Sequence, residues 1–455
     1  MRHPHVPARS VFAHRICRAT PHLVALLLAL VAALAPRPAC AQRSADSATT
    51  LYDASGIKVI QRPSQSDIVV ANLYLLGGVR QVTHATAGLE LFLLDATERG
   101  TKTYPKERLR RVMARLGTGI SIGAETDWTS IGVRATRATF DSTWAIFASR
   151  VMEPTLDPAE VELVRQQFLL AVRQRRDSPD AYAEYLADSL AYDGHPYAIP
   201  ATGTEASFSR ISVADLRKYH AEQVVKSRML LVVVGNVTRE KVQRLVAQSL
   251  GKLPAGTYAW TLPDTLPRRK AAAYAVARDL PTNYILGRYA GPRAGTKDYY
   301  ALRIATAVLS GQFFGEVRSR RNLTYAVDAP FLDRGISGGG LYVTTGQPGL
   351  TIDVMRQQLA AVRTSNVDQE ALGRLVGQFL TQFFLDNETN TEQADFLAKS
   401  YLFEGDIKAV GHFEQQLRSI TPDDIRRVAQ RWIRDVQWAY IGDASRLPKA
   451  SMERW

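Results

Sequence analysis

The sequence predicts an α+β protein in which one unit of strands and helices occurs twice. The first observation is a repeated pair: residues 211–217 begin a helix whose following strand ends at Gly235, and residues 420–426 begin another whose strand ends at Gly442. The two copies are offset by 209 residues at the helix and by 207 at the glycine. A long amphipathic helix and a set of apolar strands also occur once in each copy, which makes an internal duplication the simplest interpretation.

The first copy contains two strands, a further alternating segment and helices. Residues 57–60 and 68–76 are apolar and β-branched, which favours strands. Residues 119–136 alternate between apolar and polar side chains, so they predict one more strand. Residues 152–176 place apolar side chains at helical spacing and predict a long helix. Ser212, with an acid three residues later, is a natural N-cap for the helix before the last strand.

The second copy repeats this order. Residues 340–345 predict a strand, and residues 367–385 repeat the amphipathic pattern of the long helix. Residues 254–270 hold three prolines and a basic cluster, which is typical of a linker. We therefore predict an N-terminal domain over 48–253, a linker over 254–270 and a C-terminal domain over 271–447.

Residues 1–41 have the features of a cleaved signal peptide. Arginines precede an apolar run at 23–35, which is too short to span a bilayer, and residues 39–41 fit the small-x-small cleavage rule. Lipoprotein processing at Cys40 is disfavoured because Arg37 lies where that signal needs an apolar residue. Cys17 and Cys40 are the two cysteines of the chain. The exported protein, which we expect in the periplasm, would therefore have neither a disulfide nor a thiolate metal site.

The charge of the chain gives no sign of a nucleic-acid partner. Residues 1–41 hold five arginines and no acid, so the net charge of +13 falls to +8 in the remainder. The basic residues are dispersed and accompany no nucleic-acid-binding motif. No second apolar stretch is long enough to be a membrane span.

Residues 88–102 read Gly-Leu-Glu-Leu-Phe-Leu-Leu-Asp-Ala-Thr-Glu-Arg-Gly-Thr-Lys. The glycine before this helix and the Gly-Thr-Lys after it resemble the first helix of the insulinase and pitrilysin family of zinc peptidases, which includes the mitochondrial processing peptidase. The family carries His-x-x-Glu-His at this place. The resemblance covers nearly all of residues 51–447, and it implies two homologous α/β-roll domains of the metallohydrolase-like sandwich type.

The resemblance implies that the zinc ligands have been lost. The two histidine positions fall on Leu91 and Asp95, and the general-base position falls on Leu94. The third ligand of the family comes from a Glu-Glu pair, and that pair falls on Leu170 and Ala171. The histidines after residue 41 are isolated, whereas zinc sites need clustered ligands at fixed spacing. We therefore expect this chain to bind no metal.

A second resemblance lies in the C-terminal half. Residues 316–327 are similar to a family segment whose arginine, and a tyrosine seven residues later, bind the substrate peptide and stabilise the tetrahedral intermediate. Arg318 and Tyr325 keep that spacing. A tyrosine hydroxyl can donate to a developing oxyanion, and an arginine can orient a peptide carbonyl. The alternative is that Arg318 is a surface charge and Tyr325 a core residue at the start of a strand.

The family also binds peptides along an edge strand of the N-terminal half. The matching segment contains Glu125, Thr126, Asp127 and Trp128. Strand addition would hold an extended peptide by main-chain hydrogen bonds, whereas the alternative is an ordinary edge guarded by charges. Residues 335–340 include three consecutive glycines and predict either a flexible loop near the same chamber or a plain hairpin turn.

These observations favour a non-catalytic subunit of an exported, heterodimeric zinc peptidase. The chain would supply Arg318, Tyr325 and part of the chamber wall, while a zinc-bearing insulinase-type partner would supply the metal; the ligands would be unfolded or short peptides. One alternative is a peptide-binding or scaffold protein with no role in proteolysis. A weaker alternative is a hydrolase whose metal site has moved elsewhere.

Overall fold

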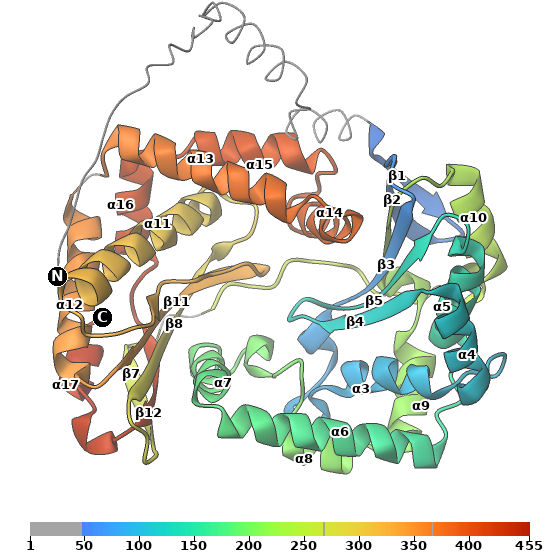
Figure 1. The fold of residues 1–455 in the computed structure, drawn as a ribbon, viewed down its shortest axis with the longest axis horizontal. Helices are drawn as coiled ribbons and strands as arrows, with labels where there is room; N and C mark the ends of the chain where they lie inside the picture. Colours follow the sequence, from blue (N-terminus) through green and yellow to red (C-terminus); the bar gives the residue numbers. More distant parts are fainter. Residues whose placement is uncertain (1–47, 267–268, 366) are drawn as a thin grey trace, which may run out of the picture.

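The computed structural model describes residues 48–266, 269–365 and 367–455 (Figure 1). The predicted signal peptide lies outside these residues. Two six-stranded sheets form the centres of two halves, each with helices packed against it. The expectation of a duplicated α+β fold is confirmed.

The N half runs from β1 to α10. Its strands are β1 (Thr50–Ala54), β2 (Ile57–Arg62), β3 (Ile68–Leu76), β4 (Gly119–Ala124), β5 (Trp128–Thr136) and β6 (Met229–Val234). Its helices are α3 (Leu89–Ala96), α4 (Lys106–Leu116), α5 (Phe140–Met152), α6 (Pro158–Asp177), α7 (Pro179–Ala191), α8 (Glu205–Arg210), α9 (Val213–Gln223) and α10 (Arg239–Gln248).

The C half runs from β7 to α17. Its strands are β7 (Ala272–Ala277), β8 (Asn283–Arg293), β9 (Val327–Asp328), β10 (Phe331–Leu332), β11 (Ile336–Thr345) and β12 (Gln437–Gly442). Its helices are α11 (Lys297–Phe313), the π-helical turn η7 (Phe314–Arg320), α12 (Pro348–Thr364), α13 (Gln369–Asp386), α14 (Asn390–Glu404), α15 (Ala409–Arg418), α16 (Pro422–Arg431) and α17 (Lys449–Met452).

Strand order shows that the halves are copies. The N-half order is β1-β2-β6-β3-β5-β4, and the C-half path is β10-β11-β8-β12-β7. In each half the last strand pairs in parallel with an early strand: β6 pairs with β2, and β12 pairs with β7. The same last strand pairs antiparallel with the long central strand, which is β3 for β6 and β8 for β12. The predicted N-cap is present, because the side chain of Ser212 forms a capping box with Asp215. Thr421 forms the same capping box with Asp424 in the second copy.

One helix of each half packs against the sheet of the other half. Helix α7 of the N half packs on β8 and β12, and α14 of the C half packs on β3 and β6. The Asp188 carboxylate on α7 accepts hydrogen bonds from Arg288 at 3.0 Å and from Arg334 at 2.7 Å. Asn390 on α14 donates to the carbonyl oxygen of Ile68 at 2.6 Å. These two helices hold the halves together. No local sequence pattern predicted this packing between the halves.

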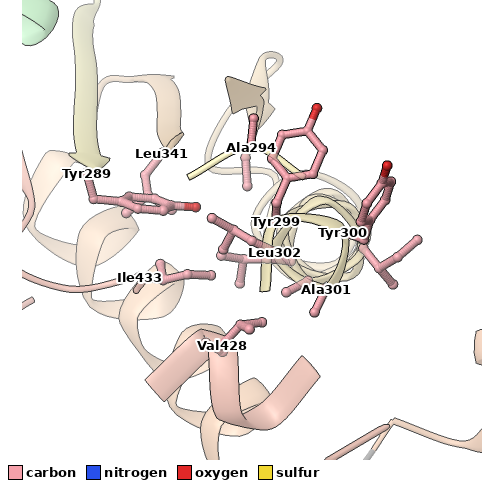
Figure 2. Packing of buried hydrophobic residues seen from close by; sticks show 14 of the residues in the cluster. Tyr289, Ala294, Tyr299, Tyr300, Ala301, Leu302, Leu341, Val428 and Ile433 are labelled. Carbon is pink, nitrogen blue, oxygen red and sulfur yellow. The ribbon is translucent and has the colours of Figure 1, made fainter. Parts of the chain in front are cut away.

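The core of the C half lies between β8, β11 and the helices α11 and α16. Figure 2 shows the ring of Tyr289 close to Leu341 and Ile433, with Leu302 of α11 beside them. Packing continues beyond the predicted domain end at residue 447, because the rings of Trp438 and Trp455 meet edge to face with 5.1 Å between their centroids.

Two segments differ from the sequence prediction. Residues 119–136 are a hairpin of β4 and β5 and not one strand. The glycines at 338–340 lie inside β11, so they form neither a flexible loop nor a hairpin turn. A Cβ atom on Gly339 would lie 2.1 Å from the hydroxyl of Tyr289, so close packing against β8 explains the glycine.

Candidate functional site

Helix α3 carries the positions that the resemblance assigns to the metal. It begins after Gly88, which has a left-handed backbone with φ of 77°. A Cβ atom there would lie 2.7 Å from the Cα atom of Gly203 and 2.8 Å from the ring of Phe208. Glycine is therefore required both by the backbone angle and by the close approach of the neighbouring turn.

The apolar side of α3 is part of the N-half core. Phe92, Leu93 and Leu94 are at most 2% exposed. The ring of Phe92 meets those of Phe168 and Phe208 edge to face, at centroid distances of 5.6 and 5.8 Å. Leu94, at the general-base position, is thus a packing residue of this core.

The two histidine positions remain partly exposed and carry unsuitable side chains. Leu91 has no donor atom for a metal, and Asp95 offers one carboxylate. Burial raises the pKa of Asp95, as does the charge of Glu98, while Arg99 and Arg150 oppose that rise. Arg150 itself is only 1% exposed. A fixed guanidinium in the electrostatic environment of Asp95 opposes the binding of a second cation there.

The third-ligand positions lie on α6 and face solvent. Leu170 is 56% exposed, and Ala171 is also exposed. Neither side chain can coordinate a metal. In the described ranges, no group of three or more His, Cys, Asp or Glu side chains lies close enough to hold a metal ion. The donor set at this place does not fit zinc.

A buried ion pair beside α3 was missed by sequence reasoning. Glu90 is only 4% exposed, although charged side chains on a helix usually face solvent. Its carboxylate lies 2.9 Å from Nη2 of Arg228 and accepts a hydrogen bond from the Tyr219 hydroxyl at 3.2 Å. Burial raises the pKa of Glu90, and Arg228 opposes that rise. The pair and the Tyr219 hydroxyl fix the start of α3 against α9 and against the turn that precedes β6.

The structure brings Arg318 and Tyr325 together. Arg318 lies in η7, and Asn322 turns the chain back through a left-handed backbone with φ of 51°, which asparagine tolerates. The guanidinium carbon of Arg318 lies 4.4 Å from the ring centroid of Tyr325 and 4.9 Å from that of Phe314. The Tyr325 residue is 81% exposed, so its alternative reading as a core residue is wrong.

Arg318 differs from its basic neighbours in its partners. Arg320 and Arg321 both pair with Glu316, at 2.6 and 3.8 Å. Among the described residues, Arg318 has no carboxylate within ion-pairing distance, and aromatic rings hold it instead. Cation–π contacts orient a guanidinium but leave its N–H groups able to donate. Arg318 is therefore a positioned donor at the surface.

The two sets of site positions occupy different parts of the chain's structure. Helix α3 packs against α6, α9 and the β4–β5 hairpin, whereas η7 packs against α11, α12 and β9. Figure 1 places α3 and α6 at the right of the molecule and α12 at the far left. Arg318 and Tyr325 are thus positioned by the C half, with the metal positions of the same chain on the other half.

The predicted edge strand needs a correction. Residues Glu125, Thr126 and Asp127 form the turn between β4 and β5, and Trp128 begins β5. Asp127 is 2% exposed, and its carboxylate accepts hydrogen bonds from the Tyr197 hydroxyl at 2.6 Å and the Gly335 amide at 2.8 Å. Asp127 therefore joins the halves and does not guard an edge.

The edge of the N-half sheet is β4 itself. It pairs with β5 on one side, and it is the last strand in the sheet order. Glu125 follows it immediately; burial raises the pKa of that carboxyl, and Lys399 and Arg334 oppose the rise. An extended peptide could add to β4 by main-chain hydrogen bonds.

Comparison with known families agrees with the fold. Residues 58–205 match the model described as insulinase (peptidase family M16), and residues 210–379 match the model described as peptidase M16 inactive domain. The chain belongs to the insulinase, or M16, peptidase family. Together the two models match most of the described chain; the first lies within the N half, and the second runs from the end of the N half into the C half.

Relatives of this M16 chain include enzymes and a subunit of a complex. Zinc protease PqqE of Helicobacter pylori is 20% identical over 84% of this chain and 89% of its own length. Subunit 1 of the mitochondrial cytochrome b-c1 complex of Caenorhabditis elegans is 23% identical over 92% and 95%. A Pseudomonas fluorescens structure described as a peptidase M16 inactive domain shares the fold, with a TM-score of 0.79, 18% identity and coverage of 87% and 98%. The protein is therefore peptidase-like in family and fold.

No helix among the described residues has the length and apolar composition needed to cross a membrane.

Proposed function

We propose that this chain is the non-catalytic subunit of an exported, two-subunit insulinase-type peptidase. A partner subunit with intact His-x-x-Glu-His would carry the zinc. This chain would supply Arg318 and Tyr325, together with part of the wall of a chamber that binds unfolded or short peptides.

The observation that carries this proposal is a contrast between the metal positions on α3 and the pair Arg318 and Tyr325. The metal positions hold Leu91, Leu94 and Asp95, with buried Arg150 acting on the one carboxylate. Arg318 and Tyr325, by comparison, are stacked at the surface of the other half. A donor pair without a metal in its own chain is useful when a second subunit brings the metal.

Two surfaces of the N half support a role in peptide binding. The unpaired side of β4 offers main-chain donors and acceptors to an extended peptide. Leu170 leaves an apolar side chain 56% exposed on α6. A chamber wall needs both kinds of contact and no catalytic group.

The periplasm is the proposed location, because residues 1–41 have the features of a cleaved signal peptide. The partner is identified by its chemistry alone, as an insulinase-type subunit with zinc ligands. We propose no nucleic-acid partner, since the basic residues are dispersed.

The test compares the purified chain alone with the chain mixed with such a subunit, using a quenched fluorescent peptide. We expect no turnover and no stoichiometric zinc for the chain alone, and turnover above that of the partner alone for the mixture. Robust zinc-dependent turnover by this chain alone would overturn the proposal and favour a relocated metal site.

A second candidate is a scaffold subunit with no role in proteolysis. The similarity to a cytochrome b-c1 complex subunit over 92% of this chain favours it, because that relative is described as part of a complex and not as a protease. The two candidates differ in one result: the scaffold predicts a stable complex whose peptidase activity does not change with Tyr325→Phe.

A further inference from the structure

A cavity of about 390 Å³ lies in the C half between α11, α13 and α14. It shares no residue with α3, η7 or β4. Figure 2 shows the hydroxyls of Tyr299 and Tyr300, both on α11, pointing away from the core residues Val428 and Ile433. Those two tyrosines contribute to the cavity wall.

The floor of this cavity is aromatic. Seven aromatic side chains line it, and three of them pack against one another. The ring of Phe383 lies 4.7 Å from that of Phe396 and 4.6 Å from that of Phe413, measured between centroids. Aromatic faces carry negative partial charge, so a box of rings attracts cations with an apolar body.

The rim of the cavity is acidic. Three exposed carboxylates from the end of α13 and from α14 contribute to it: Asp386, Glu392 and Asp395. Within the described residues, none of the three lies within 4.0 Å of a basic side chain. Asp395 accepts from Asn72 of the N half at 3.2 Å, and Asp386 accepts from Gln382 at 2.6 Å. The negative charge of these groups is therefore available to a ligand.

The two basic residues of the cavity are already paired. Arg303 and Lys399 share the carboxylate of Asp333, at 3.1 and 3.4 Å. The Arg303 guanidinium carbon also lies 4.6 Å from the ring centroid of Phe331. The fifth acid of the cavity, Glu404, lies 2.7 Å from Nε2 of His412. The side chains that line the cavity therefore have a net negative charge, because five carboxylates outnumber the two basic groups, Arg303 and Lys399.

The N half provides an equivalent cavity of different chemistry. The N-caps of α7 and α14, Ser178 and Thr389, are 211 residues apart. The same spacing relates Glu184 to Asp395 and Tyr185 to Phe396, and the earlier residue of each pair lines an N-half cavity of about 270 Å³. That cavity has two tyrosines in place of seven aromatic rings, and its three acids face two arginines.

We propose that the C-half cavity is a binding site for an organic cation, an ammonium or guanidinium group on an apolar body. Its source is either a free amine or the side chain of a peptide. The rings receive the apolar body, and the Asp386, Glu392 and Asp395 carboxylates hold the charge at the rim. This site is independent of the proposed role of Arg318 and Tyr325.

The test is isothermal titration calorimetry on the purified chain with matched probes. Phenethylammonium carries the charge and the ring, and 2-phenylethanol carries the ring alone. A short peptide with one arginine, against the same peptide with citrulline, tests the side-chain source. We expect the cationic member of at least one pair to bind at least tenfold more tightly than its neutral counterpart.

Variants locate the binding. The double change Glu392→Gln and Asp386→Asn removes two exposed charges and should weaken cation binding about fivefold. Glu184→Gln changes the N-half position equivalent to Asp395 and should leave binding unchanged. A cation bound only as the free amine, or only as the peptide, supports the site and identifies the source.

The proposal is overturned if neither cation binds or if the neutral probe binds equally well. It is equally overturned if the double variant binds the cation as tightly as the parent chain.

Discussion

The N half and the C half are two copies of one fold that have become different at equivalent places. In the N half, α3 follows the central strand β3, and its side chains belong to the core. Phe92 and Leu94 are buried, and so is Arg150. In the C half, the helix after the central strand leads into η7, which leaves Arg318 and Tyr325 at the surface. The comparison teaches that helices after equivalent strands place different side chains: buried apolar ones in the N half, and an exposed arginine–tyrosine contact in the C half.

The largest expected effect tests whether α3 is core. Phe92→Ala should lower the free energy of unfolding by about 3–5 kcal/mol, because it leaves a cavity beside the rings of Phe168 and Phe208. Tyr325→Ala, at an 81% exposed position, should change it by less than about 0.5 kcal/mol. Urea unfolding followed by tryptophan fluorescence measures both. Equal effects would contradict the contrast between the halves.

The next effect concerns α7 and α14, the helices that pack against the sheet of the opposite half. Asp188→Ala on α7 leaves the nearly buried Arg288 without its partner and should cost about 3 kcal/mol. The equivalent change on α14, Lys399→Ala, removes a partly exposed charge and should cost at most about 1 kcal/mol. The same unfolding measurement checks the order, because the Asp188 pairs join the two halves whereas the pair of Lys399 with Asp333 lies within the C half. A larger loss for Lys399→Ala would contradict the expected order.

A smaller effect concerns Asp333 of the C half. Although burial raises its pKa, Arg303 and Lys399 outweigh burial and hold that pKa well below its usual range. The stabilisation is therefore present above the unfolded pKa of about 3.9 and is lost as the pH falls toward the folded value. Asp333→Asn should cost about 2 kcal/mol at pH 7 and much less at pH 2.5. Unfolding midpoints across this range check it.

The smallest effect has the opposite sign and concerns Asp95 of the N half. Because its pKa is raised in the folded protein, ionisation destabilises the fold as the pH rises above about 3.9. Asp95→Asn should raise stability at pH 7 by a few tenths of a kcal/mol, since the group is partly exposed, and by nothing at pH 3. Loss of stability at pH 7 would show that the Asp95 charge is paired more strongly than its surroundings suggest.

The duplication could be predicted because it depends on local patterns. Capping residues, helical spacing and β-branched runs occur in both copies, and Ser212 and Thr421 cap equivalent helices. The β4–β5 turn was not predicted, because Glu125, Thr126 and Asp127 interrupt the polar and apolar alternation for only three residues and include no glycine or proline. Its geometry depends on Asp127 bonding to Gly335 of the other half.

Part of the candidate site was predicted from the sequence and part was not, because only some of its contacts depend on residues that are close in the chain. The seven-residue spacing of Arg318 and Tyr325 is visible in the sequence, and the structure brings the two side chains into contact. The burial of Glu90 against Arg228, and of Arg150 beneath α3, joins residues far apart in the chain. Such contacts follow from tertiary packing, so no periodicity or short motif indicates them.

The central claim is that Arg318 acts on the substrate of a partner's active site. The direct measurement is kcat/KM of the reconstituted complex with Arg318→Ala, compared with Arg320→Ala, which removes a neighbouring arginine that is paired with Glu316. The account predicts a loss of about tenfold or more for Arg318→Ala and little change for Arg320→Ala. Equal values for the two variants, with the complex intact, would contradict it.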